Sequence, residues 1–121
     1  MRIVASSLIA LLLLAVPVPA LPQTAHQAVI KWNPSPDAAA NPTLGYNVYK
    51  LVNACPASGT AGFTKVNASP ISALTFTDSP LGIGPVCYYA TATLNGAEGV
   101  PSNTAGGTVT PATVSITITL S

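Results

Sequence analysis

The sequence predicts an all-β protein whose short strands pack as a two-sheet sandwich. From residue 26 onward, short runs rich in Val, Ile, Thr and Tyr alternate with turns rich in Gly, Pro, Asn and Ser, which is the spacing of β-sandwich domains. No stretch in this region has the period of an amphipathic helix. Hydrophobic residues make up 49% of the 121 residues, which is enough for the core of one domain.

The first predicted strand covers residues 28–32, where alternation places the Ala, Ile and Trp32 side chains on one face. The proline-containing segment 33–37 ends this strand, because proline cannot continue a ladder of hydrogen bonds. A second strand is predicted at residues 45–50. Its even-numbered apolar side chains are expected to face the core, and Tyr49 to face outward.

The middle of the chain predicts a long loop and two short strands. Residues 53–62 are mostly small and form the loop, and residues 63–66 form a short strand. Leu74 and Phe76 then alternate toward the core before a turn. Asn67 begins a glycosylation sequence, but a proline follows that sequence directly and we expect no glycan there.

A long strand comes next, and alternation places on one of its faces the side chains of Cys87, Tyr89, Thr91 and Thr93. Asn95-Gly96 is a strong turn signal, and residues 104–110 make the last strand of the domain. Residues 113–120 then alternate strictly between polar and apolar side chains. This pattern permits an additional C-terminal strand.

The N-terminal residues 1–20 are interpreted as a secretory signal peptide, with Arg2 as its positive start. The apolar run at residues 3–16 is about 14 residues long, shorter than the roughly 20 that a membrane-spanning helix needs. A signal peptide is therefore favoured over a membrane anchor. Cleavage is expected after Ala20, with Ala25 as the alternative. The mature protein should be secreted or lie at the cell surface, extracellular or periplasmic, with no membrane span.

Cys55 and Cys87 are the two cysteines of the chain. An even count in an exported protein predicts a disulfide, and only one pairing exists. A redox or metal site is the alternative, but there is no Cys-x-x-Cys motif and His26 is distant in sequence. Closing this loop should stabilise the fold by about 3–4 kcal/mol in the chain-entropy model.

Four segments in this order resemble strands B, C and F and the F–G turn of fibronectin type III domains: Val-Ile-Lys-Trp at residues 29–32, Gly-Tyr-Asn-Val-Tyr-Lys at 45–50, Cys-Tyr-Tyr-Ala-Thr-Ala at 87–92 and Glu-Gly-Val-Pro-Ser-Asn at 98–103. The resemblance covers residues 26–110 and is closest to secreted bacterial members. It implies an immunoglobulin-like β-sandwich, used mostly for holding and binding, with Trp32 in the core between the sheets. It also places the two cysteines on or beside neighbouring strands C and F.

The chain departs from the family at two places. The family usually has a tyrosine where this chain has Cys87, so the disulfide is expected to take over the anchoring role of that tyrosine. Strand A is barely present in residues 21–27, so the edge beside strand B is expected to be open. The tail at residues 111–121 has the pattern to cover it. The sequence leaves open whether the tail folds back on its own domain, adds to a neighbour's sheet or frays.

Charged residues are only 6% of the chain. Beyond the leader, the cations balance the anions: Lys31, Lys50 and Lys65 against Asp37, Asp78 and Glu98. Nucleic acid and anionic lipid are therefore not expected as partners, because both require a basic patch. A neutral surface also weakens repulsion between copies, so weak self-association is expected to be easy.

Asp37 and Glu98 are the candidates for a carboxylate pair, because the loops that carry them cluster at one end of such a sandwich. A carboxylate pair can cleave glycosidic bonds. Turn capping is the favoured interpretation, since Asp and Glu often bond backbone amides in loops. We therefore expect no catalytic residue, no metal and no cofactor.

Tyr49 and Tyr88 are expected to point away from the core on neighbouring strands. They would either pair across the strands or offer a flat surface to a sugar or a protein. The expected function is a non-enzymatic binding or spacer module, secreted or displayed on the cell surface, that contacts protein or carbohydrate. The alternative is an extracellular assembly subunit that self-associates by donating its C-terminal strand.

Overall fold

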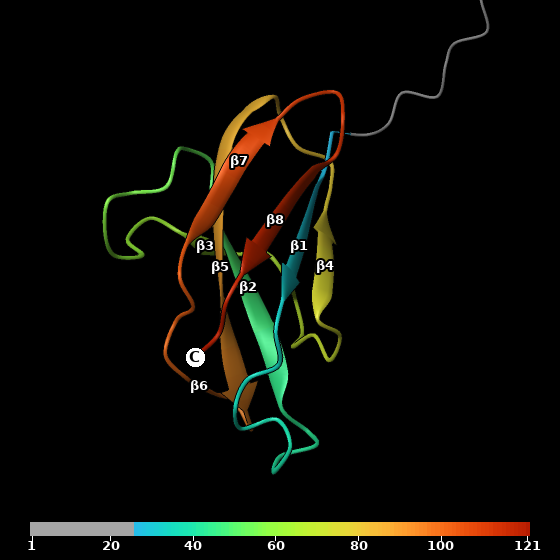
Figure 1. Ribbon diagram of the computed structural model, residues 1–121, viewed down its shortest axis with the longest axis vertical. Coiled ribbons are helices and arrows are strands. Elements are labelled where there is room, and N and C mark those ends of the chain that lie inside the picture. Colours follow the sequence, from blue (N-terminus) through green and yellow to red (C-terminus); the bar gives the residue numbers. More distant parts are fainter. Residues whose placement is uncertain (1–25) are drawn as a thin grey trace, which may run out of the picture.

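The computed structural model describes residues 26–121, which form two facing β-sheets and contain no helix (Figure 1). No membrane-spanning helix therefore occurs in this part of the chain. The signal peptide predicted at residues 1–20 and its two cleavage sites lie outside the described residues. The predicted all-β architecture is confirmed.

The strands in chain order are β1 (Ala28–Trp32), β2 (Gly45–Leu51), β3 (Thr64–Lys65), β4 (Thr75–Asp78), β5 (Gly84–Leu94), β6 (Ala97–Glu98), β7 (Ala105–Val109) and β8 (Val114–Ile118). The smaller sheet has the order β4-β1-β8. The larger sheet has the order β3-β2-β5-β6, and β7 also pairs with β5.

Strand β1 forms the middle of the smaller sheet, and its alternation is confirmed. The side chains of Ala28, Ile30 and Trp32 are buried, whereas Lys31 is exposed. On one side β1 pairs antiparallel with β4. The prediction that Leu74 faces the core is wrong: it precedes the first paired residue of β4 and its side chain is 39% exposed.

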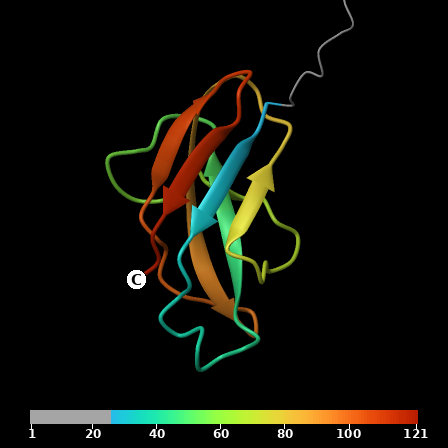
Figure 2. The same cartoon turned by 45° about the vertical axis from the view of Figure 1, so that its right-hand side comes forward.

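The C-terminal tail folds back onto its own domain. Strand β8 pairs in parallel with β1, from Ala28 opposite Val114 to Trp32 opposite Ile118, and lies beside it in Figure 2. The side chains of Ile116 and Ile118 are buried in the core. The tail therefore covers the edge of β1 that lies opposite β4.

The predicted facing of the long strand is wrong, and the physical reason is its register with β2. Cross-strand partners share a face of the sheet, and the inward Val48 is opposite Ala90, while the outward Tyr49 is opposite Tyr89. Even-numbered residues of β5 therefore face the core and odd-numbered ones face outward. Tyr88 is completely buried.

The core lies between the sheets around Trp32, as predicted. Its ring centroid lies 5.7 Å from that of Tyr46, and the indole is 5% exposed. The predicted disulfide between Cys55 and Cys87 is also present, with Cα atoms 5.1 Å apart. It ties the loop after β2 to the outward face of β5.

The predicted turn at Asn95-Gly96 joins β5 to β6. Both residues have positive φ angles, 52° and 84°, as the two central positions of a type I′ hairpin turn require. Thr93 is therefore opposite Glu98. Because Thr93 faces outward and cross-strand partners share a face, the Glu98 side chain also projects from the outward face of the larger sheet.

Candidate functional site

Three aromatic side chains meet on the outward face of the larger sheet. The rings of Tyr49 and Tyr89 stack in parallel with centroids 4.7 Å apart. Phe63, from the loop before β3, packs its ring against Tyr89 in an edge contact at 4.9 Å. Tyr89 is almost covered by this packing, while Tyr49 and Phe63 stay partly exposed. We call these three residues, together with Glu98 and Lys65, the outer-face cluster.

Glu98 extends from β6 across β5 to this cluster. Its Oε2 atom accepts hydrogen bonds from the Tyr49 hydroxyl and the Asn47 side-chain amide. The Tyr49 hydrogen bond, followed by that from Asn47, lowers the pKa of Glu98 below its ordinary value, against the opposing effect of burial. Burial and the neighbouring carboxylate raise the pKa of Tyr49 to about 12. The cluster thus pairs an ionised carboxylate with a protonated phenol across the neutral pH range.

Asn67 lies buried behind the cluster. Its Oδ1 atom accepts from the Val48 amide at 2.8 Å, and its Nδ2 atom donates to Asn47 Oδ1 at 2.9 Å and to the Ser69 carbonyl at 2.8 Å. With 7% of its surface exposed, this side chain is unavailable to a glycan. Asn67 thereby positions the Asn47 side-chain amide, which in turn donates to Glu98.

The prediction of Tyr88 as a surface contact is wrong. Its hydroxyl crosses the space between the sheets and donates to Asp78 Oδ2 at 2.7 Å, and Lys50 Nζ lies 3.0 Å from the same oxygen. Burial, with this hydrogen bond, raises the pKa of Tyr88. A buried phenol with its hydroxyl satisfied is a stable arrangement, so Tyr88 links the two sheets. The start of this strand is therefore held by this contact as well as by the disulfide.

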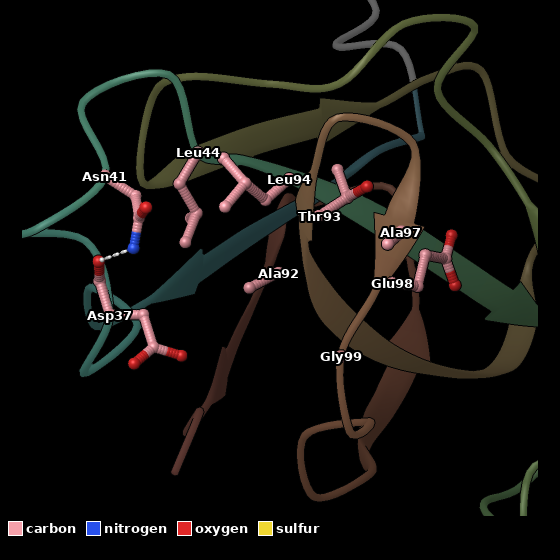
Figure 3. Close-up of a pocket in the computed structure, with 9 residues that line it drawn as sticks. All are labelled: Asp37, Asn41, Leu44, Ala92, Thr93, Leu94, Ala97, Glu98 and Gly99. Atoms are coloured by element: carbon pink, nitrogen blue, oxygen red, sulfur yellow. Dashed lines mark hydrogen bonds between the residues drawn. The ribbon is translucent and has the colours of Figure 1, made fainter.

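The two candidate carboxylates do not converge. Asp37 and Glu98 both line a pocket at the end of the sandwich, but Figure 3 shows their carboxylates at its opposite ends, with that of Glu98 pointing away. Asn41 donates from its side chain to the Asp37 backbone carbonyl at 3.0 Å. The pocket volume is about 180 Å³, below the roughly 300–1,000 Å³ of small-molecule sites.

The outward position of Tyr49 was predicted from the sequence, but the outward positions of Tyr89 and Phe63 and the anchoring role of Asn67 were not. Adjacent tyrosines must occupy opposite faces of a strand, so one of Tyr88 and Tyr89 was certain to face outward. The signal that decides between them is the register with β2, because Tyr49 faces outward and its partner must do so too. Phe63 was predicted to begin the strand at residues 63–66, but β3 covers only Thr64–Lys65 and Phe63 lies in the loop before it, where alternation carries no information.

Within residues 26–121, no three His, Cys, Asp or Glu side chains lie together as a metal site would require. No protein-family model matches this chain, and no curated protein matches it.

Proposed function

We propose that this protein is a non-enzymatic binding or spacer module of the fibronectin type III kind, secreted or displayed at the cell surface. The arrangement of strands supports the fold assignment. Strands β1 and β4 occupy the positions of B and E in one sheet, and β2, β5 and β7 occupy those of C, F and G in the other.

The outer-face cluster is the observation that carries the proposal. Partly exposed aromatic rings beside a fixed carboxylate suit contacts with a protein or a carbohydrate, because they combine apolar area with a directional hydrogen-bond acceptor. Tyr49 remains in this surface and Tyr88 does not. The rings are packed on one another, so little side-chain freedom is lost when a partner binds.

The division of the carboxylates supports a non-enzymatic role. Glu98 is committed to Tyr49 and Asn47 on the sheet face, and Asp37 lies across the small pocket from it. Paired carboxylates in glycoside hydrolysis flank one bond. A double variant, Asp37→Ala with Glu98→Ala, serves as the control in any screen for hydrolysis, and wild-type turnover that this variant loses would contradict the proposal.

The disulfide supports export. Cys87 is fully buried and bonded to Cys55, and disulfides persist mainly in extracellular and periplasmic compartments. This agrees with the signal peptide that the sequence predicts.

The binding role is tested with the exported protein immobilised against arrays of extracellular proteins and glycans. We expect saturable binding that Tyr49→Ala abolishes and that Tyr49→Phe, which keeps the ring, largely retains. Thermal unfolding of each variant shows that the fold survives. Binding that is equal in the wild type and in Tyr49→Ala would place the contact surface elsewhere.

Self-association by strand donation is the second candidate, favoured by the position of β8. It is the last strand and a sheet edge, hydrogen-bonded to its own domain through β1. Donation requires β8 to leave β1 and a neighbour's β8 to replace it. If donation occurs, a chain lacking residues 112–121 should regain its fold when a synthetic peptide of that segment is added. Failure of the peptide to bind the truncated chain would remove this candidate.

A further inference from the structure

Glu98 presents a fixed acceptor to solvent. Its Oε2 atom is held by Asn47 and Tyr49, and Asn47 is itself held by Asn67. The Thr91 side chain also contributes a hydrogen bond to the lowered pKa of Glu98, and the Glu98 residue is exposed. The carboxylate is thus held in place from the protein side, and its exposed side can accept from a donor on a ligand.

The positive charge of Lys65, on the other side of Tyr49, balances the negative charge of the Glu98 carboxylate. It is opposite Tyr49 in the pairing of β2 and β3, so both side chains share the outward face. The ammonium is close enough to contribute to the lowered pKa of Glu98, and it is exposed. The surface therefore offers one acceptor and one donor with a net charge of zero. Such a balance favours a neutral ligand over a strongly cationic or anionic one.

Tyr49 lies between the two charges and supplies the apolar part of the surface. Its ring is held by the stack on Tyr89, which Phe63 supports from the side. A sugar ring has an apolar C–H face and a rim of hydroxyl groups. A partly exposed aromatic ring flanked by a carboxylate and an ammonium matches both features.

We propose that the outer-face cluster binds a neutral carbohydrate, whose C–H face packs on Tyr49 while its hydroxyls donate to the Glu98 carboxylate and accept from Lys65. The inference rests on the binding function proposed above and names its ligand class. In this arrangement Asn47 and Asn67 are positioning residues, because they act on the sugar only through Glu98.

The test uses the exported protein and the neutral probes maltohexaose, cellohexaose and mannohexaose, with calorimetry to measure binding. We expect at least one probe to bind. Glu98→Ala should weaken it at least about tenfold, the loss of one hydrogen bond to a charged group, and Lys65→Ala should weaken it by a smaller factor. Lys65 is exposed on a two-residue strand, so Lys65→Ala should stay folded. This variant still tests the cluster if Glu98→Ala perturbs the fold.

Asp37→Asn is the matched control, because it removes the same charge from the exposed loop end of the molecule. It should leave sugar binding unchanged. No binding of any neutral probe, or equal losses in Asp37→Asn and Glu98→Ala, overturns the inference. A protein ligand that depends on Tyr49, found without sugar binding, also overturns it but leaves the proposed function standing. Binding of a lysine-rich peptide in place of the sugars also overturns the carbohydrate inference. It would show that the Glu98 carboxylate binds a cationic ligand.

Discussion

Asn67 shows how one side chain satisfies backbone groups where a sheet ends. Strand β3 is only two residues long, so the amide of Val48 on β2 has no strand partner and bonds the Asn67 side chain at 2.8 Å. The rest of the Asn67 amide fixes Asn47, and through it Glu98. The stability of the sheet edge and the geometry of the outer-face cluster thus depend on the same residue.

Replacing Asn67 by alanine should lower the free energy of unfolding by about 1–3 kcal/mol, because a buried amide loses its acceptor. Urea unfolding followed by tryptophan fluorescence measures this. Asn53→Ala is the control, since the Asn53 side chain is exposed and bonds only the adjacent Ala54 amide. Equal stability of the two variants would mean that water replaces Asn67 without cost.

The pairing of Glu98 with Tyr49 predicts pH dependence at both ends of the scale. The folded-state pKa of Glu98 lies below its ordinary 4.5, so its contribution is present above that value and is lost as the pH falls through the folded pKa. The pKa of Tyr49 is raised from 10.0 to about 12, so its contribution is present below pH 10 and is lost as the pH rises toward 12.

Glu98→Gln should therefore flatten the decline of the melting temperature in acid, and Tyr49→Phe should remove a late step from the tyrosinate absorbance titration. Calorimetry and absorbance, each compared with Asp37→Asn, measure these effects. If Tyr49 instead titrates near pH 10 in the wild type, the hydrogen bond to Glu98 does not persist in solution.

At the scale of elements, β7 is confined on both faces. The disulfide lies over Gly106, where a Cβ atom would come 2.9 Å from Cys55 Sγ and 2.7 Å from the Val86 carbonyl oxygen. On the inner face, a Cβ atom at Gly107 would come 2.8 Å from Val114 Cγ2 on β8. The adjacent glycines therefore let one strand fit between the sulfur bridge and the other sheet.

Gly106→Ala should destabilise the protein by about 1–3 kcal/mol, the usual cost of overpacking, because its closest neighbours are backbone and a bridged sulfur. Gly82→Ala is the matched control, since nothing lies within 4 Å of its Cβ position. Chemical denaturation of both variants measures the difference. If Gly106→Ala leaves the free energy of unfolding unchanged, the loop that carries Cys55 shifts away freely.

At the scale of the whole molecule, β8 completes the smaller sheet and its side of the core. Ile116, Ile118 and Leu120 contribute three buried side chains at 5% exposure or less. The end of the tail is also bonded to other parts of the fold, because Leu120 and Asn33 exchange two hydrogen bonds and the Thr119 amide donates to Asn103. The tail is part of the domain in this arrangement.

Removal of residues 112–121 should therefore abolish cooperative unfolding, because each large core truncation costs about 2–5 kcal/mol and total stability is only about 5–15 kcal/mol. Ile118→Ala should cost about 2–5 kcal/mol, whereas the exposed Thr117→Ala should change stability by less than about 0.5 kcal/mol. Circular dichroism during thermal unfolding checks all three. A truncated chain with unchanged stability would show that β8 is dispensable.

Much of the fold was predictable from local pattern. Alternation placed Trp32 on one face with its apolar neighbours and Tyr49 on the outward face, and the family resemblance implied that Trp32 lies in the core. Turn chemistry located Asn95-Gly96, and the cysteine count led to the disulfide. The candidate site was predicted only in part. Tyr88 and Tyr89 are chemically alike neighbours, and a shift of one residue exchanges their faces, so alternation alone could not decide which one is buried.

The sequence by itself determined the strand content, the disulfide and the apolar faces of β1 and β2, because these depend on side-chain periodicity and on residue counts. The tertiary structure alone decided that the tail pairs with β1 in its own domain, that Tyr88 bonds Asp78 between the sheets, and that Glu98 bonds Tyr49 away from Asp37. Each of these contacts joins residues distant in the chain or on different strands. Their formation depends on strand register and on the packing of the two sheets, which no local pattern specifies.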